Sequence, residues 1–318
     1  MFASWIYYVV LVLGFVMLTK GADYFVEGAA ATAKKFRIPA FIIGMTIVAM
    51  GTSAPECAVS VTAALKHNNE LAVSNAVGSN IFNLMVVCGV CAVIVPLSVE
   101  AGILKKEFPF SILVAILLLG LGATQMSVNR VDGLILLVVF VFFLYWMVRS
   151  AQKSRARNRA RGGEDEEIQD LSTLSCLIYI VVGLAAIVLG GDWVVDAASE
   201  IAKSFGMSQN LIGLTVVAFG TSLPELVTSF AAARKNQADM ALGNVIGSNI
   251  FNILLILGLA AAISPLSFNQ ENMVDIATLV IMSAEVFFFA KNGYNLNRFE
   301  GAIMLVEYAA YVAYICVR

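Results

Sequence analysis

Residues 42–83 read IIGMTIVAMGTSAPECAVSVTAALKHNNELAVSNAVGSNIFN, and residues 211–252 read LIGLTVVAFGTSLPELVTSFAAARKNQADMALGNVIGSNIFN. The two stretches align without a gap, and the shared register extends from Gly21 and Gly190 to Gly89 and Gly258. Self-similarity at a fixed offset indicates a chain built from two copies of one structural unit. Each copy carries a proline and a glutamate inside an otherwise apolar stretch, where both residues are costly.

The composition places the chain in a membrane. Of its 318 residues, 60% are hydrophobic and 13% are charged, whereas a soluble domain carries about 25% charged residues. The apolar residues form long runs, as spanning helices require, and do not alternate over short segments as in a membrane β-barrel. We therefore expect an all-α membrane protein.

The apolar runs predict ten transmembrane helices, five in each copy. We place them at 3–24, 40–64, 71–96, 106–125, 131–149, 173–197, 209–233, 240–263, 273–290 and 299–316. This divides the chain into a first five-helix repeat at 1–149, a charged linker at 150–172, and a second five-helix repeat at 173–318. Because each repeat has an odd number of spans, the second repeat should enter the membrane inverted relative to the first.

The distribution of basic residues predicts the orientation, since cytoplasmic turns are enriched in lysine and arginine. With the linker placed in the cytoplasm, only Lys66, Arg130, Lys203 and Arg318 fall outside. The cytoplasmic turns then hold Lys34, Lys35, Arg37, Lys105, Lys106, Arg149, Lys153, Arg155, Arg157, Arg159, Arg161, Arg234, Lys235, Lys291 and Arg298. We therefore expect a multi-pass protein of the cell membrane with both termini extracytoplasmic and the linker cytoplasmic.

The motif GTSAPE at 51–56 returns as GTSLPE at 220–225, in the middle of a predicted span each time. Proline removes a main-chain donor and clashes with the preceding turn, so the helix should break there. Carbonyl groups in the turn running back towards Ala49 and Ala218 should then need partners. Inside a bilayer such backbone is tolerated only when it is buried in protein or lines a polar cavity.

Glu56 and Glu225 add charge at the two breaks, and a carboxylate inside the membrane is by default a functional residue. The repeat should bring the two carboxylates together, where a cation would balance them. Hydroxyl groups stand beside them, at Thr52, Ser53, Thr221 and Ser222. A site made only of oxygen suits a hard cation such as calcium, magnesium, sodium or manganese, and six to eight flexible oxygens would favour calcium.

A second polar element is NAVGSNIFN at 75–83, repeated as NVIGSNIFN at 244–252. Ser79 and Asn83 are four residues apart, as are Ser248 and Asn252, so each pair shares one helix face. A single polar stripe of this kind is usually hydrogen-bonding glue between helices. Its recurrence in register with the broken helices instead favours an ion site.

These motifs resemble the α-1 and α-2 repeats of the calcium/cation antiporter superfamily, in its sodium/calcium exchanger branch. The resemblance implies that Glu56 and Glu225 are the central acidic ligands. Further ligands would be the hydroxyl and backbone oxygens of Thr52, Ser53, Thr221 and Ser222, the carbonyl groups of Ala49 and Ala218, and the side chains of Ser79, Asn83, Ser248 and Asn252. Asn75 and Asn244 would instead hold the broken helices. Some superfamily members, including potassium-dependent ones, have aspartate where Asn252 stands, so potassium transport is less expected here.

The expected function is therefore secondary active antiport of sodium against calcium by alternating access, with both ions as transported substrates, no cofactor, and the lipid bilayer as surroundings. A proton-coupled antiporter of calcium or another divalent cation remains an alternative, and a cation channel is an alternative of a different class. An enzyme is not expected, because no nucleophile and base accompany the membrane acids. No pattern indicates nucleic-acid binding. The oligomeric state is open, and a monomer fits the sequence.

Overall fold

A computed structural model describes residues 5–160, 171–206 and 218–317. In the first repeat the elements are α1 (Trp5–Phe36), α2 (Ala40–Ile43), the π-helix η1 (Gly44–Val48), α3 (Ala49–Thr52), α4 (Ala54–Leu65), α5 (Asn69–Phe82), the π-helix η2 (Asn83–Val87), α6 (Cys88–Ile94), β1 (Leu97–Ser98), α7 (Ala101–Lys105), α8 (Glu107–Gln125), β2 (Ser127–Val128) and α9 (Arg130–Ala160). The second repeat contains α10 (Thr173–Ser204), α12 (Ala218–Thr221), α13 (Leu223–Arg234), α14 (Ala238–Phe251), the π-helix η4 (Asn252–Leu257), α15 (Gly258–Ile263), β3 (Leu266–Ser267), α16 (Gln270–Lys291), β4 (Asn295–Leu296) and α17 (Arg298–Val317).

The described residues form an all-helical bundle with eight helices long and apolar enough to cross a membrane. A ninth candidate is the pair Ala40–Thr52 and Ala54–Leu65, whose two parts meet at an angle of 49°. The expected span at 209–233 falls partly outside the described residues. Eight or nine candidates is therefore the count for the described part of the chain, and ten helices stay a prediction.

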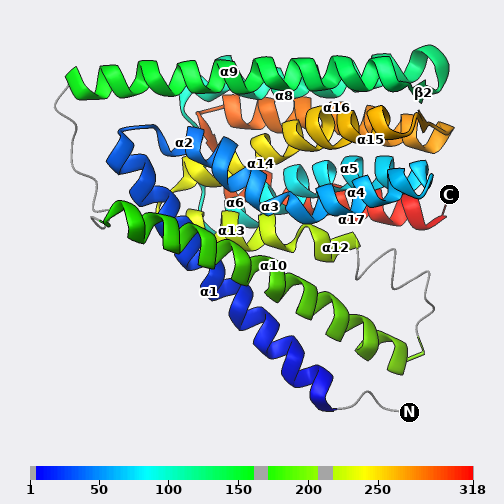
Figure 1. Cartoon of the computed structure of the whole chain (residues 1–318), viewed down its shortest axis with the longest axis horizontal. Helices are drawn as coiled ribbons and strands as arrows, with labels where there is room; N and C mark the ends of the chain where they lie inside the picture. The colour runs from blue at the N-terminus through cyan, green and yellow to red at the C-terminus, as the bar shows by residue number, and fades with distance from the viewer. Residues whose placement is uncertain (1–4, 161–170, 207–217, 318) are drawn as a thin grey trace.

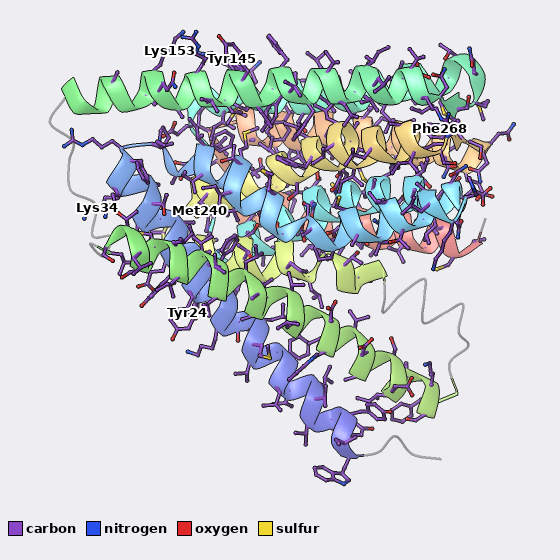
Figure 2. All side chains as sticks on the ribbon, viewed as in Figure 1. Tyr24, Lys34, Tyr145, Lys153, Met240 and Phe268 are labelled. Atoms are coloured by element: carbon purple, nitrogen blue, oxygen red, sulfur yellow. The ribbon has the colours of Figure 1, made fainter. Side chains whose placement is uncertain are left out.

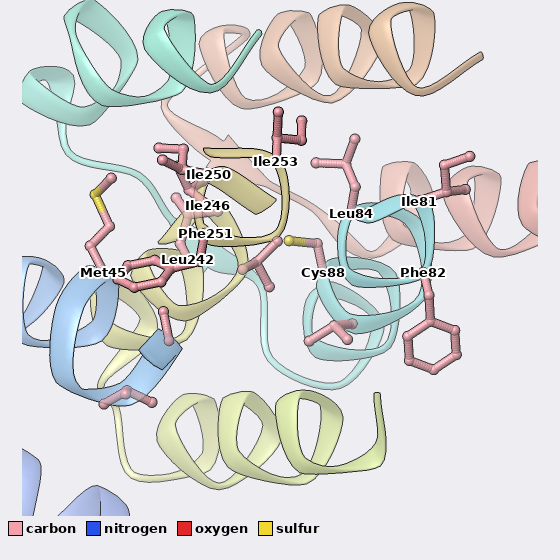
Figure 3. Packing of buried hydrophobic residues seen from close by; sticks show 14 of the residues in the cluster. Met45, Ile81, Phe82, Leu84, Cys88, Leu242, Ile246, Ile250, Phe251 and Ile253 are labelled. Atoms are coloured by element: carbon pink, nitrogen blue, oxygen red, sulfur yellow. The ribbon is translucent and has the colours of Figure 1, made fainter. Parts of the chain in front are cut away.

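Of the single-helix candidate spans in the described residues, the two central rods of the bundle are the most deeply buried (Figures 1 and 3). One is the continuous run α5–η2–α6 and the other is its repeat mate α14–η4–α15, and 72% and 78% of their most apolar windows are buried within the protein. Leu84 and Cys88 on one rod, and Ile250 and Ile253 on the other, belong to the shared apolar core. The polar stripes of both repeats therefore lie inside protein and not against lipid.

The helices of the two repeats are interleaved, because α14 packs on α2, η1 and α3 while α5 packs on η4. Gly247 allows α14 to approach η1 closely, since a Cβ atom there would lie 2.6 Å from the carbonyl oxygen of Met45. Each rod is therefore enclosed partly by the other repeat.

Helices α1 and α10 form a separate pair that runs obliquely across the bundle (Figure 1). They meet at small residues: a Cβ on Gly21 would lie 2.8 Å from the carbonyl oxygen of Gly183. Part-way along α1, the Lys235 ammonium donates to the Asp23 carbonyl at 2.9 Å and pairs with Glu27 at 3.3 Å.

Two short antiparallel strand pairs join the repeats, a feature that an all-helical expectation did not include. β1 pairs with β4 through Leu97–Leu296 and Ser98–Asn295, and β2 pairs with β3 through Ser127–Ser267 and Val128–Leu266. Each pair joins one strand of the first repeat to one of the second, so each of these contacts satisfies main-chain groups at the ends of spans.

Helix α9 also differs from the expected span, because it continues to Ala160 and does not end at 149. Its second part carries the charged stretch that was expected to be linker, and lysine and arginine favour helices as strongly as most residues do. Tyr145 and Lys153 point away from the bundle on this helix (Figure 2).

Candidate functional site

The two broken helices are built alike. Ser53, between α3 and α4, has φ −82° and ψ 9°, and Ser222, between α12 and α13, has φ −95° and ψ 5°. Pro55 and Pro224 lie in the first turns of the helices that follow, where a missing N–H costs no hydrogen bond within that helix. Each proline thus starts a new helix in mid-span and places the glutamate after it in the first turn.

Glu56 and Glu225 are completely buried, and each is hydrogen-bonded by a serine of the opposite repeat. The Ser53 hydroxyl donates to Glu225 Oε1 at 2.9 Å, and the Ser222 hydroxyl donates to Glu56 Oε1 at 3.2 Å. These two hydrogen bonds are related by the internal symmetry, because Ser53 and Ser222 occupy equivalent positions in the two repeats, as do the two glutamates. The two breaks therefore form a single site.

The polar stripes of the central rods face the same site. Ser222 lies 3.2 Å from Ser79, hydroxyl to hydroxyl, which connects the broken helix of the second repeat to α5 of the first. Ser79, Asn83, Ser248 and Asn252 are all buried. Asn83 and Asn252 are also the first residues of the π-helices η2 and η4, and single π turns of this kind occur often at functional sites.

Several buried side-chain atoms at the site have no hydrogen-bond partner among the described residues. They are Glu56 Oε2, Glu225 Oε2, Ser248 Oγ, Asn252 Oδ1, and both amide atoms of Asn83. Native proteins rarely leave such atoms unpaired, because an unmatched buried polar group costs about 1–3 kcal/mol. All but one of these atoms are oxygen, so the donor set fits a hard cation.

Threonine and asparagine side chains brace the site. The Thr52 hydroxyl lies 3.1 Å from Asn244 Oδ1 and also donates to the Val48 carbonyl at 3.2 Å. Asn75 donates to the Glu56 carbonyl at 3.2 Å and to Ser60 at 2.9 Å, and Asn244 makes the matching bonds to the Glu225 carbonyl at 3.5 Å and to Ser229 at 2.9 Å. The two asparagines therefore fasten the first turns after the breaks to α5 and α14.

The two expected carbonyl ligands are those of Ala49 and Ala218. The Ala49 oxygen accepts the main-chain N–H of Ser53 at 3.0 Å, so it is already engaged across the break, although a carbonyl oxygen has a second lone pair. Ala218 begins α12 and lies at the edge of the described residues. Thr221 is half-buried in the same short helix.

Asn80 and Asn249 are site residues that the sequence reasoning missed. They are the last residues of the GSN triplets in both repeats, and each follows a serine that was predicted to be an ion ligand. Each donates its amide to the main-chain carbonyl of the other, at 3.1 and 3.2 Å. Their presence in both repeats was the available signal, but spacing along one helix face selected only the residues four apart.

A cavity of about 450 Å³ opens beside the site, between α4 and η4. Ser53 lines it together with Cys57 on α4 and with Leu255 and Ile256 on η4. Ser53 also bonds Glu225 through its hydroxyl, so the cavity lies next to the hydrogen-bond network of the carboxylates. Within the described part of the chain, no group of three or more histidine, cysteine, aspartate or glutamate side chains could hold a metal ion.

The profile of the sodium/calcium exchanger protein family matches residues 6–149 and 175–317, and the chain belongs to that family. It is 40% identical to the putative antiporter CaxA of Alkalimonas amylolytica, over 95% of this chain and 96% of that one. It is 33% identical to the sodium/calcium exchanger MaX1 of Methanosarcina acetivorans, over 96% and 97%.

Solved structures of the sodium-calcium exchanger NCX_Mj are similar throughout. The structure soaked with zero Na⁺ and Ca²⁺ superposes with a TM-score of 0.85 at 34% sequence identity, over 97% of this chain and 98% of that one. The structure soaked with 2.5 mM Na⁺ and 10 mM Sr²⁺ gives a TM-score of 0.84 at the same identity and coverage. The expected resemblance to sodium/calcium exchangers is thereby confirmed, and the family is one of transporters.

Proposed function

We propose that this protein is a secondary active antiporter that exchanges sodium for calcium across the cell membrane by alternating access. The observation that carries the proposal is the pair of buried carboxylates, Glu56 and Glu225, each bonded by a serine from the opposite repeat. Membership of the exchanger family and the likeness to NCX_Mj support the same assignment.

Charge explains why such a site would exchange ions and not leak them. One Ca²⁺ neutralises two carboxylates, and sodium ions can do the same, whereas the empty site carries two negative charges. Burying an unbalanced charge in a low-dielectric interior is strongly unfavourable. The site therefore reorients across the membrane when loaded and stalls when empty, and this couples the two ion flows.

The transported ions take oxygen ligands from both repeats in this proposal. Each ligand type has a mate in the other repeat, as expected for a site on an internal symmetry axis near the middle of the membrane. The ligand set is Glu56, Glu225, Thr52, Thr221, Ser53, Ser222, Ser79, Ser248, Asn83 and Asn252, with the backbone oxygens of Ala49 and Ala218. The unpaired buried oxygens at the site support this set.

The arrangement proposed for the membrane is ten spans in two inverted repeats, with repeats at 1–149 and 173–318. The termini lie outside and the linker at 150–172 lies in the cytoplasm. The strand pairs support this arrangement, because β1 and β4 belong to turns assigned to the cytoplasmic side, whereas β2 and β3 belong to turns assigned to the outer side.

Calcium uptake into proteoliposomes tests the function directly. We expect radiolabelled calcium to enter vesicles loaded with sodium, and not vesicles loaded with potassium or given only a proton gradient. Uptake driven by protons would instead identify a proton-coupled antiporter. Flux that needs no counter-ion would identify a channel, because a channel conducts down the calcium gradient alone.

Modification of Cys57 tests the role of the cavity. Cys57 is half-buried and lines the cavity one residue after Glu56, so a methanethiosulfonate attached there would place a positive charge beside the carboxylates and compete with the ion. We expect the reagent to remove most calcium uptake from the wild type and to leave Cys57→Ala unaffected. Equal inhibition of both proteins would show that the reagent acts elsewhere, for example at the exposed Cys316.

A further inference from the structure

We propose that Asn80 is a positioning residue that holds the amide of Asn252 with its oxygen towards the transported ion. The proposal rests on the function proposed above, which places Asn252 among the ion ligands. It concerns a residue outside the proposed ligand set, and it follows from hydrogen bonds that break the internal symmetry of the site.

The symmetric part of the arrangement joins the two central rods. Asn80 Nδ2 donates to the Asn249 carbonyl at 3.1 Å, and Asn249 Nδ2 donates to the Asn80 carbonyl at 3.2 Å. Both side chains are buried, and the two residues are repeat mates on α5 and α14. We call this pair the amide clamp. As far as these two bonds are concerned, Asn80 and Asn249 are equivalent.

The asymmetric part lies at the side-chain oxygens of the amide clamp. Asn80 Oδ1 accepts a hydrogen bond from Asn252 Nδ2 at 2.9 Å. At the equivalent position in the other repeat, Asn249 Oδ1 has no partner within the part of the chain that the structure describes, and neither amide atom of Asn83 has one there. Only one of the two ligand asparagines is therefore fixed by the clamp.

The hydrogen bond from Asn252 to Asn80 fixes which end of the Asn252 amide faces the ion site. An asparagine side chain has a donor end and an acceptor end of almost equal shape, so rotation by half a turn exchanges them. The Nδ2 group of Asn80 is held by the Asn249 carbonyl, so Asn80 presents its Oδ1 to Asn252. This oxygen can accept a hydrogen bond only from the Nδ2 end of Asn252. Asn252 Oδ1 is left buried with no partner in residues 5–160, 171–206 and 218–317, and a cation attracts this end of the amide and repels the other.

Two alanine variants separate positioning from simple stabilisation of the rods. Asn80→Ala and Asn249→Ala each remove one donor of the amide clamp, but only Asn80→Ala also removes the acceptor for Asn252. We expect the apparent KM for calcium in sodium-loaded vesicles to rise roughly fivefold to tenfold in Asn80→Ala, as loss of one hydrogen bond predicts. In Asn249→Ala it should change less than about twofold, with the maximal rate similar in both.

Asn80→Ala also loses the bond from Asn252, so its thermal unfolding midpoint should fall somewhat further than that of Asn249→Ala, and the KM for calcium is the measurement that reports positioning. If alanine prevents folding, Asn80→Leu and Asn249→Leu fill a similar volume and give the same comparison. Equal KM values in the two members of a pair would overturn the proposal, because the amide clamp would then act only as a structural link.

A double substitution tests whether Asn80 acts through Asn252. In an Asn252→Ala background, adding Asn80→Ala should leave the KM for calcium unchanged, since the amide to be positioned is gone. Independent, multiplying effects would overturn the proposal. An unchanged KM in Asn252→Ala alone would remove Asn252 from the ion site and this inference with it, while loss of uptake in Glu56→Gln would still support exchange at the carboxylates.

Discussion

Replacing Glu56 by glutamine is expected to abolish sodium-driven calcium uptake, and Glu225→Gln is expected to do the same. Glutamine keeps the size of the side chain and an oxygen that can accept the serine hydroxyl, so the variant removes the charge alone. Leaving the other charge of a buried ion pair unbalanced costs about 3–5 kcal/mol. Each 1.4 kcal/mol is about tenfold in affinity, so calcium binding should fall by more than about a hundredfold.

The measurement is initial uptake of radiolabelled calcium into sodium-loaded proteoliposomes, at equal amounts of folded protein. Glu100→Gln is the matched control, because Glu100 is an exposed acid in the turn before α7, outside the site. It should transport at the wild-type rate. Wild-type uptake in either site variant would mean that the proline-glutamate breaks serve only to bend the helices.

Gly247→Ala is expected to cause a clear loss of stability in the central rods. A Cβ atom at this position would lie 2.6 Å from the Met45 carbonyl oxygen and 2.8 Å from the Ala49 Cβ, so α14 must move away from η1 and α3. Overpacking of this kind costs about 1–3 kcal/mol. The variant should therefore unfold at a temperature several degrees lower, as measured by tryptophan fluorescence of the purified protein.

Gly120→Ala provides the control for the helix propensity of alanine. Gly120 lies inside α8 and is exposed, and within the described chain no atom lies within 4 Å of a Cβ built there. Alanine is favoured over glycine in a helix by up to about 1 kcal/mol, so this variant should be as stable as the wild type or slightly more stable. Similar losses in both variants would refute close contact as the reason for Gly247.

The features that could be read from the sequence are those with a local physical cause. Pro55 and Pro224 cannot continue a helix, so breaks near Ser53 and Ser222 follow from the residues themselves. The polar stripes follow from helical spacing. Because the breaks and the stripes recur together in both repeats, the sequence indicates that they belong to one site. The exchanger family was likewise recognisable from the motifs and is confirmed by the comparisons.

The features that escaped prediction depend on how the two repeats meet. Spacing within one helix does not reveal that Ser53 bonds Glu225 and not Glu56, or that Asn80 and Asn249 bond each other. The π-helices at Asn83 and Asn252 and the two-residue strand pairs also depend on tertiary packing, because isolated residues of these types prefer neither. The continuation of α9 to Ala160 was not predicted because its charged end lacks apolar periodicity, although its residues favour helix.

The interleaving of the two repeats has a consequence for synthesis of the chain. The hydroxyl that bonds Glu56 belongs to Ser222, which the ribosome adds 166 residues later. At about 5–20 residues per second, this is a delay of roughly 10 to 30 seconds. During that interval a newly inserted first half holds a glutamate in the membrane without the serine that binds it in the finished protein. The two halves are therefore a single unit of assembly, since each carboxylate finds its serine only when both halves have been made.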